Sequence, residues 1–323
     1  MAQLTGTSDT HRVGTAGGLR EDLEDVIWDL FAEDTYCLTN FEKTKAQATY
    51  HEWLTDALSG ATANRMIEGD DFAYTTIVSP TRVGNYVQTS KKTFLISSIL
   101  EEVSKAGRKS QIARDAMKQM RELKNDVELA LVGNQASSAG GSATARSSAG
   151  MESWISGNIV KATTTSSSST GGFSAGVVTA PVDGTTTGAM TEASFKSALQ
   201  AAWADGGDAR VILCDSTQKS VIDGFAGIAT RFVDVQRTAK ASIIGSADVY
   251  VSAYGRHTLV LHRHVRSQTV MAIDPEYWGV AFIRRPFMET LAKTGDAEKR
   301  AILTDFCLVS RNQNASAKVV SAA

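Results

Sequence analysis

The chain has 323 residues, of which 42% are hydrophobic and 21% charged, a composition typical of a soluble protein with a substantial core. Its formal net charge of −2 excludes a globally basic surface that would attract nucleic acid. The first residues lack a secretory signal and no run reaches the roughly 18 apolar residues of a membrane span, so we expect a cytoplasmic protein without membrane contact.

The N-terminal region, residues 1–40, is predicted to be a flexible arm followed by a short helix. Residues 1–18 are polar and glycine-rich and cannot pack a core of their own. Residues 19–31 have apolar side chains at helical spacing and an acidic opposite face. The apolar positions are Leu23, Val26, Ile27, Leu30 and Phe31, and the acidic ones are Glu21, Asp22, Glu24, Asp25 and Asp29. We interpret the acidic run as a solvated helix face rather than a metal site.

Residues 41–99 are predicted to form an extended loop built as a long β-hairpin. Its strands are expected at residues 50–54, 74–78 and 82–88, and Pro80 interrupts the returning strand. A two-stranded hairpin is marginal in water, so we expect this one to lie on a neighbouring copy of the chain. Its candidate inter-subunit contacts, as charge pairs and apolar anchors, are Trp53, Asp56, Arg65, Met66, Glu68, Asp70 and Asp71.

A long amphipathic helix is predicted over residues 107–132, within a segment that we bound at 100–134. One apolar stripe follows its length, at Ile112, Ala116, Met120, Leu123, Val127 and Leu131. On the solvent side we expect i,i+4 ion pairs between Lys118 and Glu122 and between Lys124 and Glu128. Gly133 is expected to end the helix.

The rest of the chain is predicted to contain a linker-like segment and a second lobe. Residues 135–189 are rich in Ser, Thr and Gly and are expected to be partly ordered. Residues 190–290 have the pattern of an α+β lobe: a helix at 192–204 capped by Thr191, a buried strand at 210–214, a helix capped by Asp215, and strands at 248–254, 258–264, 268–273 and 280–284. Residues 291–323 comprise a strand at 302–310 that returns to the long helix, then a polar tail from Asn312.

Catalytic and metal-binding patterns are weak. His262 and His264 share one face of a predicted strand and could hold a metal with a third ligand, but no HExxH motif or cysteine pair supports this. Cys37, Cys214 and Cys307 are far apart and indicate buried thiols. We therefore predict no catalytic residue, cofactor or metal, and keep an α+β enzyme with a site near His262 and His264 as an alternative.

The order and spacing of four stretches carry a family resemblance. They are Tyr50-His51-Glu52-Trp53-Leu54-Thr55-Asp56, Thr81-Arg82-Val83-Gly84-Asn85-Tyr86, Gly107-Arg108-Lys109-Ser110, and Glu122-Leu123-Lys124 continuing to Gly133-Asn134. Together they resemble the major capsid (major head) proteins of tailed bacteriophages with the HK97-type fold. The resemblance is strong over residues 40–134 and looser over 190–309.

The resemblance implies an α+β, HK97-like capsid fold with an N-terminal arm, an extended loop, a spine helix, a peripheral domain and an axial domain. It implies a structural protein of the virion that self-assembles in the host cytoplasm. Pentamers and hexamers would form an icosahedral shell that encloses double-stranded DNA without sequence-specific binding. Scaffolding, portal and decoration proteins are candidate partners. An encapsulin-like protein compartment is the alternative within the same fold.

Some related shells are locked by an isopeptide bond between a lysine on the extended loop and an asparagine of another subunit. The loop tip in this chain, residues 57–71, contains Arg65 but no lysine. We therefore expect a shell held together by noncovalent contacts.

Overall fold

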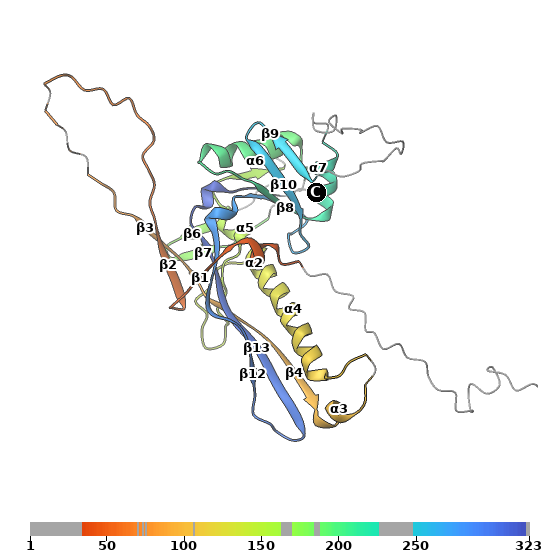
Figure 1. Cartoon of the computed structure of the whole chain (residues 1–323). Helices are drawn as coiled ribbons and strands as arrows, with labels where there is room; N and C mark the ends of the chain where they lie inside the picture. Colours follow the sequence, from red (N-terminus) through yellow and green to blue (C-terminus); the bar gives the residue numbers. More distant parts are fainter. Residues whose placement is uncertain are drawn as a thin grey trace, which may run out of the picture.

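In the computed structural model the chain forms an elongated body with a β-sheet in each of two lobes (Figure 1). The structure describes residues 34–320 except for residues 70, 73, 75, 106, 163–169, 184–187 and 226–247. The predicted arm and the predicted helix at 19–31 thus lie outside the described residues. No helix within the described ranges is long and apolar enough to cross a membrane.

The first lobe is helix α4 (Gln111–Val132) packed on a four-stranded sheet. The strands, in spatial order, are β1 (Glu42–Lys45), β12 (Trp278–Thr290), β13 (Ala297–Ser310) and β4 (Gln88–Ser97). Strand β13 is antiparallel to both of its neighbours, and β1 is parallel to β12. A short helix, α3 (Ser98–Glu102), follows β4 and precedes α4. Strands far apart in sequence therefore form one surface on which the long helix lies.

Helix α4 is the long helix that the apolar stripe predicts, although it begins at Gln111 rather than at residue 107. Ser110 caps it, because its side chain accepts a hydrogen bond from the backbone N–H of Ala113 at 3.2 Å. Leu123, Val127 and Leu131 are buried, as the stripe requires. The hydrophobic period thus determines which face of α4 meets the sheet.

The second lobe is a six-stranded sheet with two helices. Its strands, in spatial order, are β5 (Ile159–Lys161), β14 (Ala317–Val320), β11 (Thr269–Ile273), β8 (Val211–Cys214), β10 (Gly255–Leu261) and β9 (Val249–Ser252). Thr191 and Ser194 form a capping box at the start of α6 (Glu192–Ala204), and Asp215 caps α7 (Ser216–Asp223). The elements predicted between residues 190 and 273 are all present, as α6, β8, α7, β9, β10 and β11.

Two expectations about the chain's later part are wrong. Residues 317–320 are not a polar tail, because β14 is a fully buried strand between β5 and β11. Strand β12, which we assigned to the second lobe up to residue 290, pairs with β1 and β13 in the first lobe's sheet. The chain therefore passes from the second lobe back to the first lobe after β11, which ends at Ile273.

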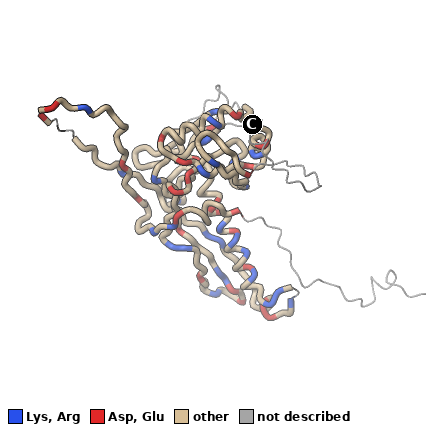
Figure 2. The backbone as a smooth tube through the Cα atoms, turned by 45° about the horizontal axis from the view of Figure 1, so that its top comes forward, with Lys and Arg blue, Asp and Glu red and all other residues tan. Residues whose placement is uncertain are grey.

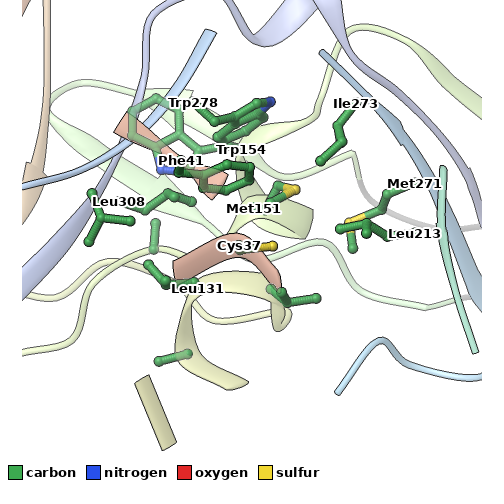
Figure 3. Packing of buried hydrophobic residues seen from close by; sticks show 14 of the residues in the cluster. Cys37, Phe41, Leu131, Met151, Trp154, Leu213, Met271, Ile273, Trp278 and Leu308 are labelled. Atoms are coloured by element: carbon green, nitrogen blue, oxygen red, sulfur yellow. The ribbon is translucent and has the colours of Figure 1, made fainter. Parts of the chain in front are cut away.

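The Ser/Thr/Gly-rich segment contributes to the core that joins the two lobes. It contains α5 (Met151–Trp154), which is buried throughout, and the small hairpin of β6 (Gly172–Ser174) and β7 (Val177–Thr179). Trp154 stacks on Phe173 with ring centroids 5.8 Å apart. Figure 3 shows Met151 and Trp154 in one cluster with side chains of both lobes, among them Leu131, Leu213, Met271 and Leu308. A segment with the composition of a linker thus contains a short buried helix in the core between the two lobes.

A partly buried polar cluster holds this segment to the second sheet. Arg266 donates hydrogen bonds to the carboxylates of Glu152 and Asp183, and Thr269 donates to Glu152 at 3.0 Å. The Nζ of Lys318, in β14, donates to the backbone carbonyl of Glu152 at 2.6 Å. Burial lowers the pKa of Lys318 from its usual 10.5 to about 8.

The depressed pKa of Lys318 predicts a specific pH dependence of stability. Between about pH 8 and pH 10.5 the unfolded chain binds more protons at this lysine than the folded chain, so its contribution to stability rises with pH in that window and is constant below it. The difference in free energy of unfolding between wild type and Lys318→Met should increase in favour of the wild type by roughly 1–2 kcal/mol from about pH 8 to pH 9.5. Urea unfolding of the unassembled subunit measures it, and a constant difference would contradict the prediction.

Candidate functional site

The most prominent surface feature is the extended loop, defined here as residues 56–80 together with the two strands at its base. Strand β2 (Tyr50–Thr55) pairs antiparallel with β3 (Thr81–Tyr86), from Tyr50 opposite Tyr86 to Thr55 opposite Thr81. The described residues between the two strands form no helix or strand. The predicted strand at 74–78 is therefore wrong: Tyr74 is 95% exposed and Ile77 91% exposed. Figure 1 shows the loop projecting away from both lobes.

The loop exposes an unusual set of large apolar side chains. Leu58 is 100% exposed, and six other large apolar side chains among the described residues of 56–80 are more than half exposed. These six are Met66, Ile67, Phe72, Tyr74, Ile77 and Val78. A cluster of exposed apolar side chains on one projection marks an interaction surface, because single exposed residues are common but concentrations of them are not.

The charged residues that we predicted as contacts lie on the same loop. Asp56, Arg65 and Glu68 are exposed, and Figure 2 shows both signs of charge along the loop. Asp56 accepts a hydrogen bond from the backbone N–H of Ala57, and Asp71 accepts one from Phe72, both at 2.9 Å. These are local contacts between adjacent residues. Asp70 lies outside the described residues.

Trp53 has a different position from the other predicted contacts. It lies in β2 at the base of the loop, partly buried, and its ring lies 5.7 Å from that of Trp154. Its indole N–H donates to the backbone carbonyl of Ser310 at 2.8 Å. Trp53 therefore fixes the loop to the core of its own subunit, and the predicted contact with a neighbour stays a prediction.

Asn85 in β3 is the second anchor of the loop, and no sequence pattern identifies it as one. It is completely buried; its amide donates to the carbonyl of Leu308 at 2.8 Å and to the hydroxyl of Ser148 at 3.1 Å. Its side-chain oxygen accepts the N–H of Ala149 at 3.0 Å. One side chain thus joins the loop's base to β13 and to the middle segment. A polar residue in an exposed-looking strand gives no sequence signal for such contacts.

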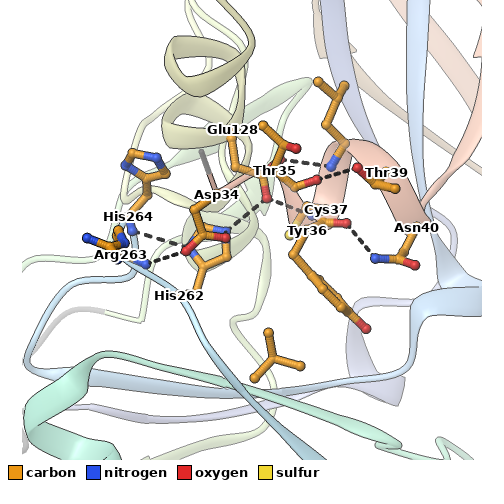
Figure 4. A network of polar contacts seen from close by, with 12 residues as sticks. Asp34, Thr35, Tyr36, Cys37, Thr39, Asn40, Glu128, His262, Arg263 and His264 are labelled. Atoms are coloured by element: carbon orange, nitrogen blue, oxygen red, sulfur yellow. Dashed lines mark hydrogen bonds and ion pairs between the residues drawn. The ribbon is translucent and has the colours of Figure 1, made fainter. Parts of the chain in front are cut away.

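A second polar site joins three separate parts of the chain around Glu128. Its carboxylate accepts hydrogen bonds from the backbone N–H groups of Cys37 at 2.6 Å and Leu38 at 2.8 Å, in the short helix α2 (Tyr36–Asn40), and lies 2.9 Å from Nε2 of His262. Figure 4 shows these groups converging from α2, α4 and the loop after β10. The predicted Lys124–Glu128 pair on the solvent side is therefore wrong, whereas the Lys118–Glu122 pair is confirmed at 3.9 Å.

The hydrogen bonds of His262 define its role. The backbone N–H of His264 donates to Nδ1 of His262 at 3.2 Å, so Nε2 carries the proton that His262 donates to Glu128. Nearby, Asp34 accepts the N–H of Arg263 at 2.8 Å. Both ring nitrogens of His262 are thus used in contacts within the chain, and His262 is wholly buried rather than at a core edge.

Ligand atoms of Cys37, Glu128 and His262 lie within 4.8 Å of one another, the grouping that a metal would require. The hydrogen bonds do not favour such a site, because no lone pair of the His262 ring points toward Glu128 and the carboxylate already accepts three donors. Burial, and then the Glu128 carboxylate, raise the pKa of the Cys37 thiol well above its usual value, which disfavours the thiolate that metals bind. The arrangement holds elements together and offers no open position for substrate.

With this geometry, the family of the chain can be assigned. The family model of the SU10 major capsid protein matches residues 3–323. The chain belongs to this family. It is therefore a subunit of a capsid shell, and the exposed loop belongs to a protein that assembles with copies of itself. No curated protein matches the sequence.

Solved structures confirm the HK97-like fold of this capsid protein. A chain of Microbacterium phage Oxtober96 aligns with a TM-score of 0.62 at 12% identity, covering 97% of this chain and 98% of that one. The capsid of a native GTA particle, computed with C5 symmetry, aligns with a TM-score of 0.63 at 10% identity, covering 98% and 99%. The SrpI encapsulin complex of Synechococcus elongatus PCC 7942 aligns at 0.57 and 10% identity, covering 98% and 96%. At these identities the likeness shows the fold alone.

The anchoring role of Trp53 predicts a loss of stability in the isolated capsid subunit. Trp53→Ala removes a partly buried ring and an indole hydrogen bond, so the free energy of unfolding should fall by roughly 3 kcal/mol. Leu58→Ala is the matched control on the exposed part of the loop and should change it by less than about 0.5 kcal/mol. Urea unfolding of both variants measures the difference. Equal effects would show that Trp53 is not an internal anchor.

The contacts of Glu128 predict that two substitutions in helix α4 lower the free energy of unfolding by different amounts. Glu128→Ala leaves the N–H groups of Cys37 and Leu38 without their acceptor, and it should lower the free energy of unfolding by roughly 3 kcal/mol or more. Glu122→Ala removes only the partly exposed pair with Lys118 and should cost less than about 1 kcal/mol. Chemical denaturation of the two variants is the measurement; a cost for Glu128→Ala no larger than that for Glu122→Ala would refute the role assigned to Glu128.

Proposed function

We propose that many copies of this capsid protein form the icosahedral head shell of a tailed phage, with pentamers and hexamers as its units, around double-stranded DNA. The observation that carries the proposal is the anchored, exposed loop. Its base is fixed by Trp53 and Asn85, while its described apolar side chains have no partner surface in their own subunit. Such a loop gains stability only when a neighbouring subunit covers it.

The contacts between subunits are proposed to be noncovalent. The loop offers apolar anchors, including Met66, and charged groups of both signs at Asp56, Arg65, Glu68 and Asp71, with Asp70 completing the predicted set. Each contact can be weak, because one subunit makes several and closed symmetry multiplies them. The absence of a lysine between residues 57 and 71 argues against a covalent lock at the loop tip.

The second lobe is the proposed meeting point of copies around each pentamer or hexamer axis. Its sheet ends in β9, an edge strand that carries exposed Val249 and Val251. Exposed apolar residues on a sheet edge favour association with another surface. The loop and the edge strand β9 are thus two separate candidate contact regions of the subunit.

A net charge of −2 suits a wall that contains DNA rather than one that grips it, and we infer a structural rather than an enzymatic role. The enzyme alternative near His262 and His264 finds no support in the hydrogen bonds of these residues. Assembly in the host cytoplasm, with scaffolding, portal and decoration proteins as partners, completes the proposal. An encapsulin-like compartment is the alternative on the same fold.

Replacing two exposed apolar loop residues tests the proposal. The double variant Leu58→Asp/Ile77→Asp should remain folded, because both side chains are at least 91% exposed, but it should lose shell formation. The control Leu58→Met/Ile77→Val keeps the apolar character and should assemble. Negative-stain electron microscopy and sedimentation of the purified proteins distinguish shells from subunits.

Shells from wild type and control but only subunits from the Asp variant would support the proposal. Normal shells from the Asp variant would refute the role of the loop. Covalent multimers of the wild-type shell on a denaturing gel would refute the noncovalent lock.

A further inference from the structure

An apolar groove lies between helix α4 and strands β12 and β13, beside the buried stripe of the helix. Met117, Met120, Met288 and Ile302 line it, and Arg121 and Lys124 form its rim. Ile302 is completely buried and forms part of the floor, whereas Met117 is 62% exposed and Met288 44% exposed. Three methionines at one exposed groove favour a helical partner, because the unbranched thioether side chain adapts to the shape of an apolar ligand surface.

A second, basic stripe of α4, distinct from the buried apolar stripe, runs along one side of the groove. Positions 114, 117, 121, 124 and 128 recur at spacings of three and four, so they lie on one face of the helix. Between Arg114 and Lys124 this face carries Arg114, Met117, Arg121 and Lys124, and no carboxylate. Figure 2 shows Lys and Arg recurring along α4. An acidic, amphipathic partner therefore matches both the apolar floor and the charge of the rim.

The last position of the basic stripe is Glu128, which accepts hydrogen bonds from α2, close to the first described residue. Its carboxylate accepts the N–H groups of Cys37 and Leu38, and Asp34 is held by the N–H of Arg263. The chain at residue 34 therefore enters the body next to one end of the groove. From Glu128 to Met117 is eleven residues of helix, or roughly 16 Å.

The segment that directly precedes this point has the matching chemistry. Residues 19–31 have the apolar positions Leu23, Val26, Ile27, Leu30 and Phe31 at helical spacing, and five carboxylates against the single Arg20. A helix of these thirteen residues would be roughly 20 Å long, close to the length of the stripe. Only residues 32 and 33 separate it from Asp34, so its end can be no further than roughly 10 Å from the anchored chain.

We propose that residues 19–31 bind as a helix in the groove of α4 in the same subunit. The segment's apolar face covers Met117, Met120 and Met288, and its acidic residues face Arg121 and Lys124. The two-residue connection makes the effective concentration of the segment at its own groove high, which favours this occupant over a second copy of the chain. The proposal is independent of the shell proposed above, because it concerns the single subunit.

Hydrogen exchange of the full-length protein, at concentrations where sedimentation shows a monomer, tests this inference. In wild type the amides of residues 19–31 should exchange at least about tenfold more slowly than in an unstructured peptide of the same sequence. Met117→Asp and Lys124→Glu should each remove most of that protection. Leu129→Asp is the matched control, since Leu129 is 52% exposed on the same helix but not on the stripe, and protection should remain.

Exchange within α4, followed in the same experiment, shows whether a variant has disturbed the helix itself. Three outcomes would overturn the inference: unprotected amides at 19–31 in wild type, protection that survives both groove substitutions, or protection that increases with protein concentration. The last outcome would assign the groove to a second copy of the chain.

Discussion

The proposed contact between subunits depends on a fixed base for the extended loop, and Asn85 supplies that base. Its carboxamide is buried and makes hydrogen bonds to β13 and to residues 148 and 149. Leaving any of these buried groups without a partner would cost about 1–3 kcal/mol, so the strand has one favourable position. Trp53, in the other strand of the loop's base, β2, packs against Trp154 and donates a hydrogen bond to the carbonyl of Ser310. Both strands at the base of the loop are therefore held on the core of the same subunit.

The Glu128 carboxylate, near the C-terminal end of α4, also holds distant parts of the chain together. It joins α2, α4 and the segment after β10 through three hydrogen bonds, two of them to backbone donors. A buried carboxylate is expensive unless its lone pairs are used, and here they are used by groups from three distant parts of the sequence. The same contacts hold the first described residues, 34–40, on the body. Helix α4 thus packs against the core with its apolar face and holds α2 through Glu128.

Periodic and local signals were sufficient for much of the fold. The stripe through Leu123, Val127 and Leu131 identified α4, the Thr191 cap identified the start of α6, and the apolar run at 211–214 identified β8. What failed depended on contacts between distant residues. Nothing local shows that Lys318 lies in a buried strand, because its pairing to β11 and its bond to Glu152 are set by the tertiary fold. The same holds for Glu128, whose place on a charged helix face favoured a solvent-side ion pair.

The sequence predicts where the extended loop lies in the chain, but it does not predict the conformation of the loop residues. Turn-forming residues and alternating strands located the loop, but the apolar residues at 74–78 indicated a strand where the described residues are extended and exposed. A β-rich composition without a pairing partner in the same chain does not make a strand, because the hydrogen bonds of the backbone have no acceptor there. This exposure is consistent with the proposal that a neighbouring subunit covers the loop.

Hydrogen exchange of residues 56–80 in free subunits and in assembled particles tests the central claim most directly. The account predicts fast exchange in the subunit, where these described residues form no strand, and exchange slowed by at least about tenfold in the particle, where a neighbour covers the loop. Equally fast exchange in both states would contradict it and would mean that the loop remains uncovered in the shell.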